Sequence, residues 1–186
     1  MGCIWFTSDL HFGHDRAFIY SPRGFTSVEE MNLAIQTRWN QVIDSQDEVY
    51  ILGDLMLGNN FMGMELLSTL NGQLHIIRGN HDTDTRIELY KTLSNVVEIC
   101  DAKFLKIDGY HFYLTHFPCF TGNLEKEALK QMTLNLSGHT HSTNKFYMDC
   151  PFIYNVAVDA HNCYPINFET IIHDMKEKII ECQKYL

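Results

Sequence analysis

The sequence lacks several patterns that mark common protein classes. It contains no Cys-x-x-Cys pair, no run of five or more lysines and arginines, and no apolar stretch near the roughly 18 residues that a membrane span requires. These absences argue against a zinc knuckle, a dithiol redox motif and a membrane helix. The cysteines are scattered, and we interpret them as reduced thiols: Cys3, Cys100, Cys119, Cys150, Cys163 and Cys182.

Positive charge is scarce as well. Fourteen lysines and arginines stand against 23 aspartates and glutamates, which gives a net charge of -9. Long nucleic acid is therefore not an expected partner, because non-specific binding to it needs a continuous positive surface. A small phosphate ester is compatible with this charge if bound cations supply the positive charge. The N-terminus shows neither a basic leader nor an apolar segment of signal-peptide length, so we expect a cytoplasmic protein with no contact to a membrane.

Length and composition predict one domain. A chain of 186 residues that is 45% hydrophobic suits a single core. The sequence has no internal repeat, low-complexity tract or linker rich in proline, glycine and serine. We therefore expect a single domain over residues 1–186.

Apolar runs alternate with helical patterns in the first half of the chain. Ser27 and Glu30 form a capping-box signature before one of the helical patterns. Such alternation predicts an α/β fold with parallel strands, and ligands of such sheets lie outside the carboxyl ends of the strands. The expected strands are 3–8, 48–52 and 74–77, and the expected helices are 28–42 and 62–70.

The pattern changes in the second half. Two strands flank Asp108, Gly109 and Tyr110, which predicts a hairpin with a tight turn. A closing helix is expected from about residue 168, with its apolar residues on one face. The expected strands here are 103–107, 111–115, 133–137 and 152–158.

Polar residues follow these strand ends, and all of them offer oxygen or imidazole ligands. Divalent transition metals accept imidazole and carboxylate together, whereas calcium and magnesium favour oxygen alone. Asp54 stands alone after its strand, beside Gly53, and is the natural bridge between two ions. The full set is Asp9, His11, Asp54, Asn80, His81, His116, His139 and His141.

The order of these motifs resembles the calcineurin-like metallophosphoesterase superfamily, in particular its small bacterial and phage members. The motifs that carry the resemblance are Asp9-Leu10-His11, Gly53-Asp54, Gly79-Asn80-His81-Asp82, His116 and Gly138-His139-Thr140-His141. The resemblance implies a two-sheet β-sandwich flanked by helices, with a dimetal site at the carboxyl ends of the strands. This differs from the single doubly wound sheet that periodicity alone suggests.

The resemblance also implies a role for each residue of the set. One metal would be held by Asp9, His11 and His141, and the other by Asn80, His116 and His139, with Asp54 bridging both. His81 would be free of metal and would face the substrate, either stabilising charge on the phosphoryl oxygens or protonating the leaving oxygen. The implied ions are two divalent transition metals, with manganese preferred and iron, nickel or zinc as alternatives.

We expect the reaction to be hydrolysis of a small phosphodiester by a metal-bridging hydroxide. A phosphomonoesterase or a nuclease of the same fold is an alternative, and a metal-binding protein-interaction scaffold is an alternative from a different class. The oligomeric state is not determined by the sequence.

Several residues have two interpretations. His14 lines the active site or makes a local hydrogen bond. Arg16 and Arg23 contact a substrate phosphate or lie on the surface. Asp82 is a candidate for orienting His81, and Asn155 and Asp159 for supporting the site from behind. The segment Phe117 to Phe120 walls the pocket or packs on the core. We interpret the remaining histidines as structural: His75, His111, His161 and His173.

Overall fold

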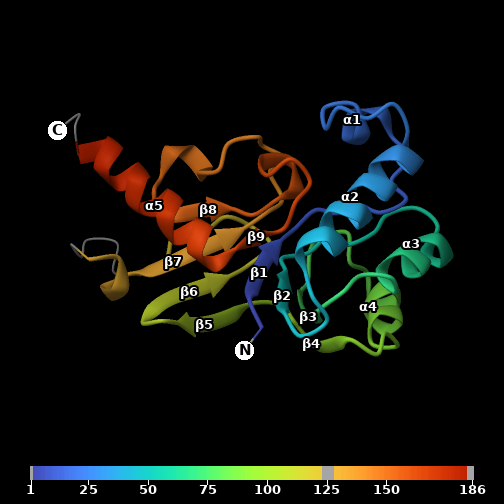
Figure 1. The fold of residues 1–186 in the computed structure, drawn as a ribbon, viewed down its shortest axis with the longest axis horizontal. Helices are drawn as coiled ribbons and strands as arrows, with labels where there is room; N and C mark the ends of the chain where they lie inside the picture. The colour runs from blue at the N-terminus through green and yellow to red at the C-terminus, as the bar shows by residue number, and fades with distance from the viewer. Residues whose placement is uncertain (1, 123–127, 184–186) are drawn as a thin grey trace.

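Two β-sheets form the centre of the molecule (Figure 1). The computed structural model describes residues 2–122 and 128–183. Sheet 1 has the order β4-β3-β2-β1-β9, in which only β9 is antiparallel to its neighbour. Its strands are β1 (Ile4–Thr7), β2 (Glu48–Ile51), β3 (Gln73–Ile77), β4 (Val96–Cys100) and β9 (Ile166–Asn167).

Sheet 2 has the order β5-β6-β7-β8, with an antiparallel first pair followed by parallel pairs. Asp108 and Gly109 turn the chain between β5 and β6 with positive φ angles of 48° and 83°, as a two-residue hairpin turn requires. The strands are β5 (Lys103–Ile107), β6 (Tyr110–Leu114), β7 (Thr133–Ser137) and β8 (Ile153–Asn155).

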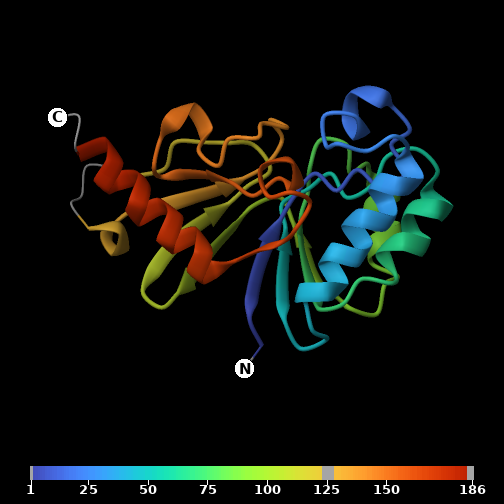
Figure 2. The same cartoon turned by 45° about the horizontal axis from the view of Figure 1, so that its top comes forward.

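The helices cover sheet 1 on one side and sheet 2 on the other (Figure 2). The first long helix begins after Ser27, whose hydroxyl accepts the Glu30 N–H. The Glu30 carboxylate accepts from Thr26 and not from Ser27, so the expected capping box closes one residue earlier. The helices are α1 (Ala17–Tyr20), α2 (Val28–Val42), α3 (Asn60–Leu67), α4 (Asp84–Tyr90) and α5 (Phe168–Gln183), with 3-10 turns at Leu129–Gln131, Tyr147–Asp149 and Val158–Ala160.

Sheet 1 separates two hydrophobic clusters. The first lies between sheet 1 and helices α2, α3 and α4, and its largest side chain is Trp39. The second lies between the two sheets and α5, where Phe6 contacts Tyr50 and Phe112. The strands of sheet 1 are buried on both faces, which explains their nearly continuous apolar sequences.

The expected two-sheet architecture is confirmed, with some local corrections. The strand expected at 152–158 ends at Asn155, because the Asn155 side chain accepts the Ala157 N–H and a 3-10 turn follows. The helix expected at 62–70 begins at Asn60, where Asn59 caps it. Four short elements were not predicted from the sequence: α1, α4, β4 and β9. Within the described residues, no helix is both long and apolar enough to span a bilayer.

Substitution of Trp39 tests the packing of α2 on sheet 1. Its side chain is fully buried and its indole N–H donates to the Asn71 carbonyl at 2.9 Å. We expect Trp39→Ala to lower the free energy of unfolding by about 3–5 kcal/mol in urea denaturation. Leu33→Ala on the same helix, where 63% of the residue is exposed, should change it by less than about 0.5 kcal/mol. Equal losses for the two variants would contradict this account of the core.

Candidate metal centre

The predicted ligands follow the carboxyl ends of strands in both sheets. In sheet 1, the parallel strands β1, β2 and β3 end just before the segments that carry Asp9, Asp54 and Asn80. In sheet 2, the parallel strands β6 and β7 precede His116 and His139. The two edges meet, because the His116 ring nitrogen Nε2 lies 2.8 Å from Asn80 Oδ1.

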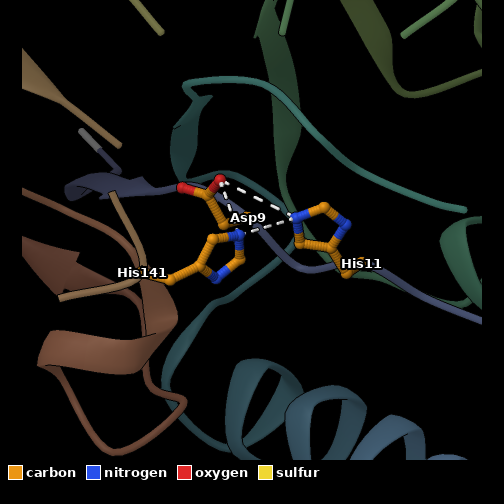
Figure 3. Close-up of side chains that lie close together, drawn as sticks. All are labelled: Asp9, His11 and His141. Carbon is orange, nitrogen blue, oxygen red and sulfur yellow. Dashed lines mark hydrogen bonds and ion pairs between the residues drawn. The ribbon is translucent and has the colours of Figure 1, made fainter. Parts of the chain in front are cut away.

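Asp9, His11 and His141 form a first donor group, in which the three side chains point toward one another (Figure 3). The Nε2 atoms of the two histidines lie 3.1 Å apart. Each of these nitrogens lies 3.9 Å from Asp9 Oδ1. A single cation placed among these three atoms would contact all of them.

Asn80, His116 and His139 form a second donor group beside the first. Asn80 Oδ1 lies 3.0 Å from His139 Nδ1 in addition to its contact with His116. Asp54 stands between the groups, with Oδ2 3.7 Å from His11 Nε2 and 3.5 Å from His116 Nε2. The fold thus brings all seven predicted ligands together. A carboxylate oxygen of Asp9 also lies within 4.8 Å of the donor atoms of Asp54 and His116, although the family resemblance implied a place for it in the first group only.

The backbone at the centre is strained. Five of the seven residues have positive φ angles, a region that side chains other than glycine rarely adopt. The neighbouring Gly53 has φ 90°, and a Cβ atom there would lie 2.6 Å from both Gly79 and the His116 ring. Only glycine fits where these loops cross. The strained ligands are Asp9, His11, Asp54, His139 and His141, with φ angles of 57°, 52°, 57°, 70° and 48°.

The donor atoms fit divalent cations. Asp9 is fully buried, and its Oδ1 atom has no hydrogen-bond partner among the described residues. Such an orphaned buried carboxylate oxygen is costly unless a cation contacts it. Burial, with the nearby His141, lowers the pKa of His11 to about 2, so the ring stays neutral and keeps a lone pair for a metal. Burial also raises the pKa of Asp54, because the loss of hydration disfavours the charged carboxylate.

Comparison with known proteins identifies the family. The model of the calcineurin-like phosphoesterase superfamily domain matches residues 3–155. The chain belongs to this superfamily.

Protein MJ1445 of Methanocaldococcus jannaschii is 34% identical to this chain over 180 residues, covering 91% of this chain and 89% of that protein. The gene 66 protein of Mycobacterium phage D29 is 27% identical over 200 residues, covering 95% of this chain and 99% of that protein. The crystal structure of AQ665 from Aquifex aeolicus has a similar fold, with a TM-score of 0.71, 24% identity and coverage of 93% of this chain and 99% of that chain.

Asp82 does not orient His81, contrary to one expectation from the sequence. Its Oδ2 atom accepts the N–H groups of Asp54 and Gly79, at 2.8 and 2.9 Å. Its Oδ1 atom accepts the Leu55 N–H and the Tyr90 hydroxyl. The carboxylate therefore fixes the two loops that present Asp54 and Asn80, and its four hydrogen bonds go to groups other than the His81 ring.

His81 lies at the open side of the donor groups. Its side chain is 43% exposed, and Nε2 lies 4.0 Å from Asp54 Oδ2. The His81 N–H donates to Asp54 Oδ1 at 2.8 Å and its carbonyl accepts from Arg86, so the backbone is held while the ring faces outward. His14 lines the same side, with its ring 5.3 Å from that of His11, and burial lowers its pKa.

Arg23 is neither on the surface nor free for substrate. Its side chain is only 1% exposed, and it forms an ion pair with Asp159. Asp159 in turn contacts the His141 ring, which confirms a supporting position behind the site. Asn155 holds the loop after His141 through the carbonyls of Ser142 and Asn144. Arg16 is exposed, as one of its two interpretations expected.

Residues outside the seven predicted ligands contact their own neighbours in the fold. His75 lies between the carboxylates of Glu48 and Glu98, and His161 donates to the Asn155 carbonyl. Phe117 is 51% exposed and its ring lies 4.6 Å from that of His139, so it walls the site and does not pack on the core. Sequence reasoning missed Arg86 and Tyr90, two residues of α4 that donate hydrogen bonds to the loop after β3, at the His81 carbonyl and the Asp82 carboxylate. No local sequence signal identifies these contacts.

Replacing Asp82 tests its role in shaping the centre. An asparagine amide can accept at only one of the two positions, so two N–H or O–H donors lose their acceptor. We expect Asp82→Asn to lower the free energy of unfolding of metal-free protein by about 2–4 kcal/mol and to weaken metal binding. Urea denaturation in EDTA and calorimetric titration with manganese measure the two effects. Asp84→Asn, whose carboxylate is 92% exposed, is the matched control and should behave as wild type in both.

Proposed function

We propose that this protein hydrolyses a small phosphodiester with two divalent transition-metal ions. The observation that carries the proposal is the pair of adjoining donor groups with Asp54 between them, on a calcineurin-like phosphoesterase fold. A single carboxylate between two sets of imidazole donors is the arrangement expected of a dinuclear site. The orphaned oxygen of Asp9 adds an independent sign that a cation belongs there.

The residues of the two groups would hold the ions. Asp9, His11 and His141 would bind one, and Asn80, His116 and His139 the other, with Asp54 shared. Manganese is the preferred metal, and iron, nickel or zinc fits the same mixed nitrogen and oxygen ligands. When bound, such ions acidify water and offset the charge of phosphoryl oxygens.

His81 would act on the substrate. Its ring faces the open side while its backbone is fixed by Asp54 and Arg86. An imidazolium there can donate a proton to the oxygen that leaves phosphorus. General acid catalysis of this kind contributes roughly 10²- to 10⁴-fold to the rate.

The surroundings favour a small substrate. Asn80 and His139 are exposed, and Phe117 offers an apolar surface beside His139. The net charge of -9 disfavours a long polyanion. A phosphomonoester or a nucleic acid is the alternative substrate for the same centre. A cytoplasmic location stays a prediction.

An assay with matched variants tests the proposal. Metal-stripped protein is reloaded separately with manganese, nickel, zinc and magnesium, then given bis(p-nitrophenyl) phosphate and p-nitrophenyl phosphate in parallel. We expect the diester to be cleaved faster, and cleavage to depend on a transition metal.

Two variants separate catalysis from metal binding in this assay. His81→Ala should lose about 10²- to 10⁴-fold in kcat while its metal content stays at the wild-type level. Asp54→Asn should lose both activity and metal. If metal-loaded wild-type protein cleaves neither substrate, the proposal fails for these ester classes and the scaffold alternative gains weight. Faster cleavage of the monoester would replace the diester assignment.

A further inference from the structure

A buried arginine connects two of the loops that carry ligands. Arg23 lies in the segment between α1 and α2, and its Nη2 atom donates to the Asp9 carbonyl at 2.9 Å. Its Nη1 atom donates to the Leu10 carbonyl at 3.3 Å. These two carbonyls belong to the strained turn that presents Asp9 and His11. Arg23 therefore holds the backbone of that turn from the side away from solvent.

The same guanidinium binds the Asp159 carboxylate through two parallel hydrogen bonds. Nε donates to Oδ1 and Nη2 to Oδ2, both at 2.9 Å. Asp159 lies in the 3-10 turn after β8, and its side chain is 8% exposed. A bidentate arginine–carboxylate pair of this kind fixes the orientation of both partners.

Asp159 in turn orients the ring of His141. Its Oδ2 atom lies 3.2 Å from His141 Nδ1. An N–H at Nδ1 that donates to the carboxylate leaves the lone pair of Nε2 directed toward His11 and Asp9. Because Asp159 cancels the charge of Arg23, the pair adds no positive charge beside a cation.

Neither partner serves the second donor group. Within the described part of the chain, Arg23 and Asp159 form no hydrogen bond with Asn80, His116 or His139. Asp82 supports the Asp54 and Asn80 loops by separate contacts. The two donor groups are thus supported by different carboxylates, Asp159 for the first and Asp82 for the second, which share no hydrogen bond among the described residues.

We propose that Arg23 and Asp159 are positioning residues that form a clamp for one metal ion only, the ion of Asp9, His11 and His141. The inference rests on the proposed two-metal centre. Losing such a partner of a ligating histidine typically weakens metal binding about 10- to 100-fold. We therefore expect that removing the clamp lowers the affinity for the ion of the first group and leaves the affinity for the other ion unchanged.

Manganese binding tests the clamp without reference to hydrolysis. Full-length protein is stripped with EDTA and titrated with Mn²⁺, and free Mn²⁺ is followed by its six-line EPR signal. We expect wild-type protein to bind two ions per chain. Asp159→Asn and Arg23→Met should keep one ion at wild-type affinity and bind the other about 10- to 100-fold more weakly. Arg23→Lys, which keeps the charge without the two parallel bonds, should fall between.

Arg38→Met is the matched control. Arg38 also donates to the segment after Asp159, through the Asn162 carbonyl at 2.9 Å, but within the described residues it forms no hydrogen bond with a loop that carries a ligand. It should bind two ions as wild type does. If it instead loses one ion to the same degree, loosening of that segment explains the effect and the clamp is wrong.

A double variant identifies which ion is weakened. Asn80→Ala should weaken the ion of the second group, so Asp159→Asn combined with Asn80→Ala should bind neither ion tightly. A double variant that still holds one tight ion would place both residues at the same ion and overturn the assignment. Circular dichroism and urea denaturation in EDTA check that each variant folds, and Asp159→Asn carries the test if Arg23→Met does not.

Wild-type affinity for both ions in folded Asp159→Asn would also overturn the clamp. Wild-type protein that binds fewer than two ions would remove the two-metal centre, and this inference with it. Two bound ions without hydrolysis of any ester would contradict only the proposed function and leave the clamp standing.

Discussion

The site depends on how closely the loops after β1 and β2 approach each other. Their parallel pairing continues beyond the strand ends, because the N–H groups of Asp9 and His11 donate to the carbonyls of Gly53 and Asp54, both at 3.0 Å. These bonds hold left-handed backbone that costs about 1–3 kcal/mol for each non-glycine residue. The five strained ligands together therefore cost roughly as much as the net stability of a small domain, about 5–15 kcal/mol. The two apolar clusters around sheet 1 must offset that cost.

Charge at this edge is balanced in two different ways. Asp82 is satisfied by four protein donors and Asp159 by a bidentate arginine, so neither requires a metal. Asp9 and Asp54 instead turn an oxygen toward imidazole nitrogens, and the Asp9 Oδ1 atom has no partner among the described residues. The carboxylates that face the centre are thus those left for cations, while those behind it shape the loops.

Much of this arrangement is predictable from the sequence. A ligand such as Asp54 or His139 directly follows an apolar run, and the parallel order of strands places such residues at one edge. The end of a strand can be recognised from the residues around it in the sequence. Because parallel strands end at the same edge, the seven ligands could be expected to converge. The second sheet came from the resemblance of the motifs and not from periodicity, which cannot distinguish one sheet from two.

The remaining features depend on contacts between distant parts of the chain. Arg23 and Asp159 are 136 residues apart, and nothing in either neighbourhood indicates the pair. His81 and Asp82 are adjacent, yet one side chain faces the open site while the other turns inward to bind backbone N–H groups. A motif specifies neighbours in sequence, but burial decides which neighbour meets the substrate. Asp82 turns inward because four N–H and O–H donors from the loops after β2 and β3 and from Tyr90 surround its carboxylate there.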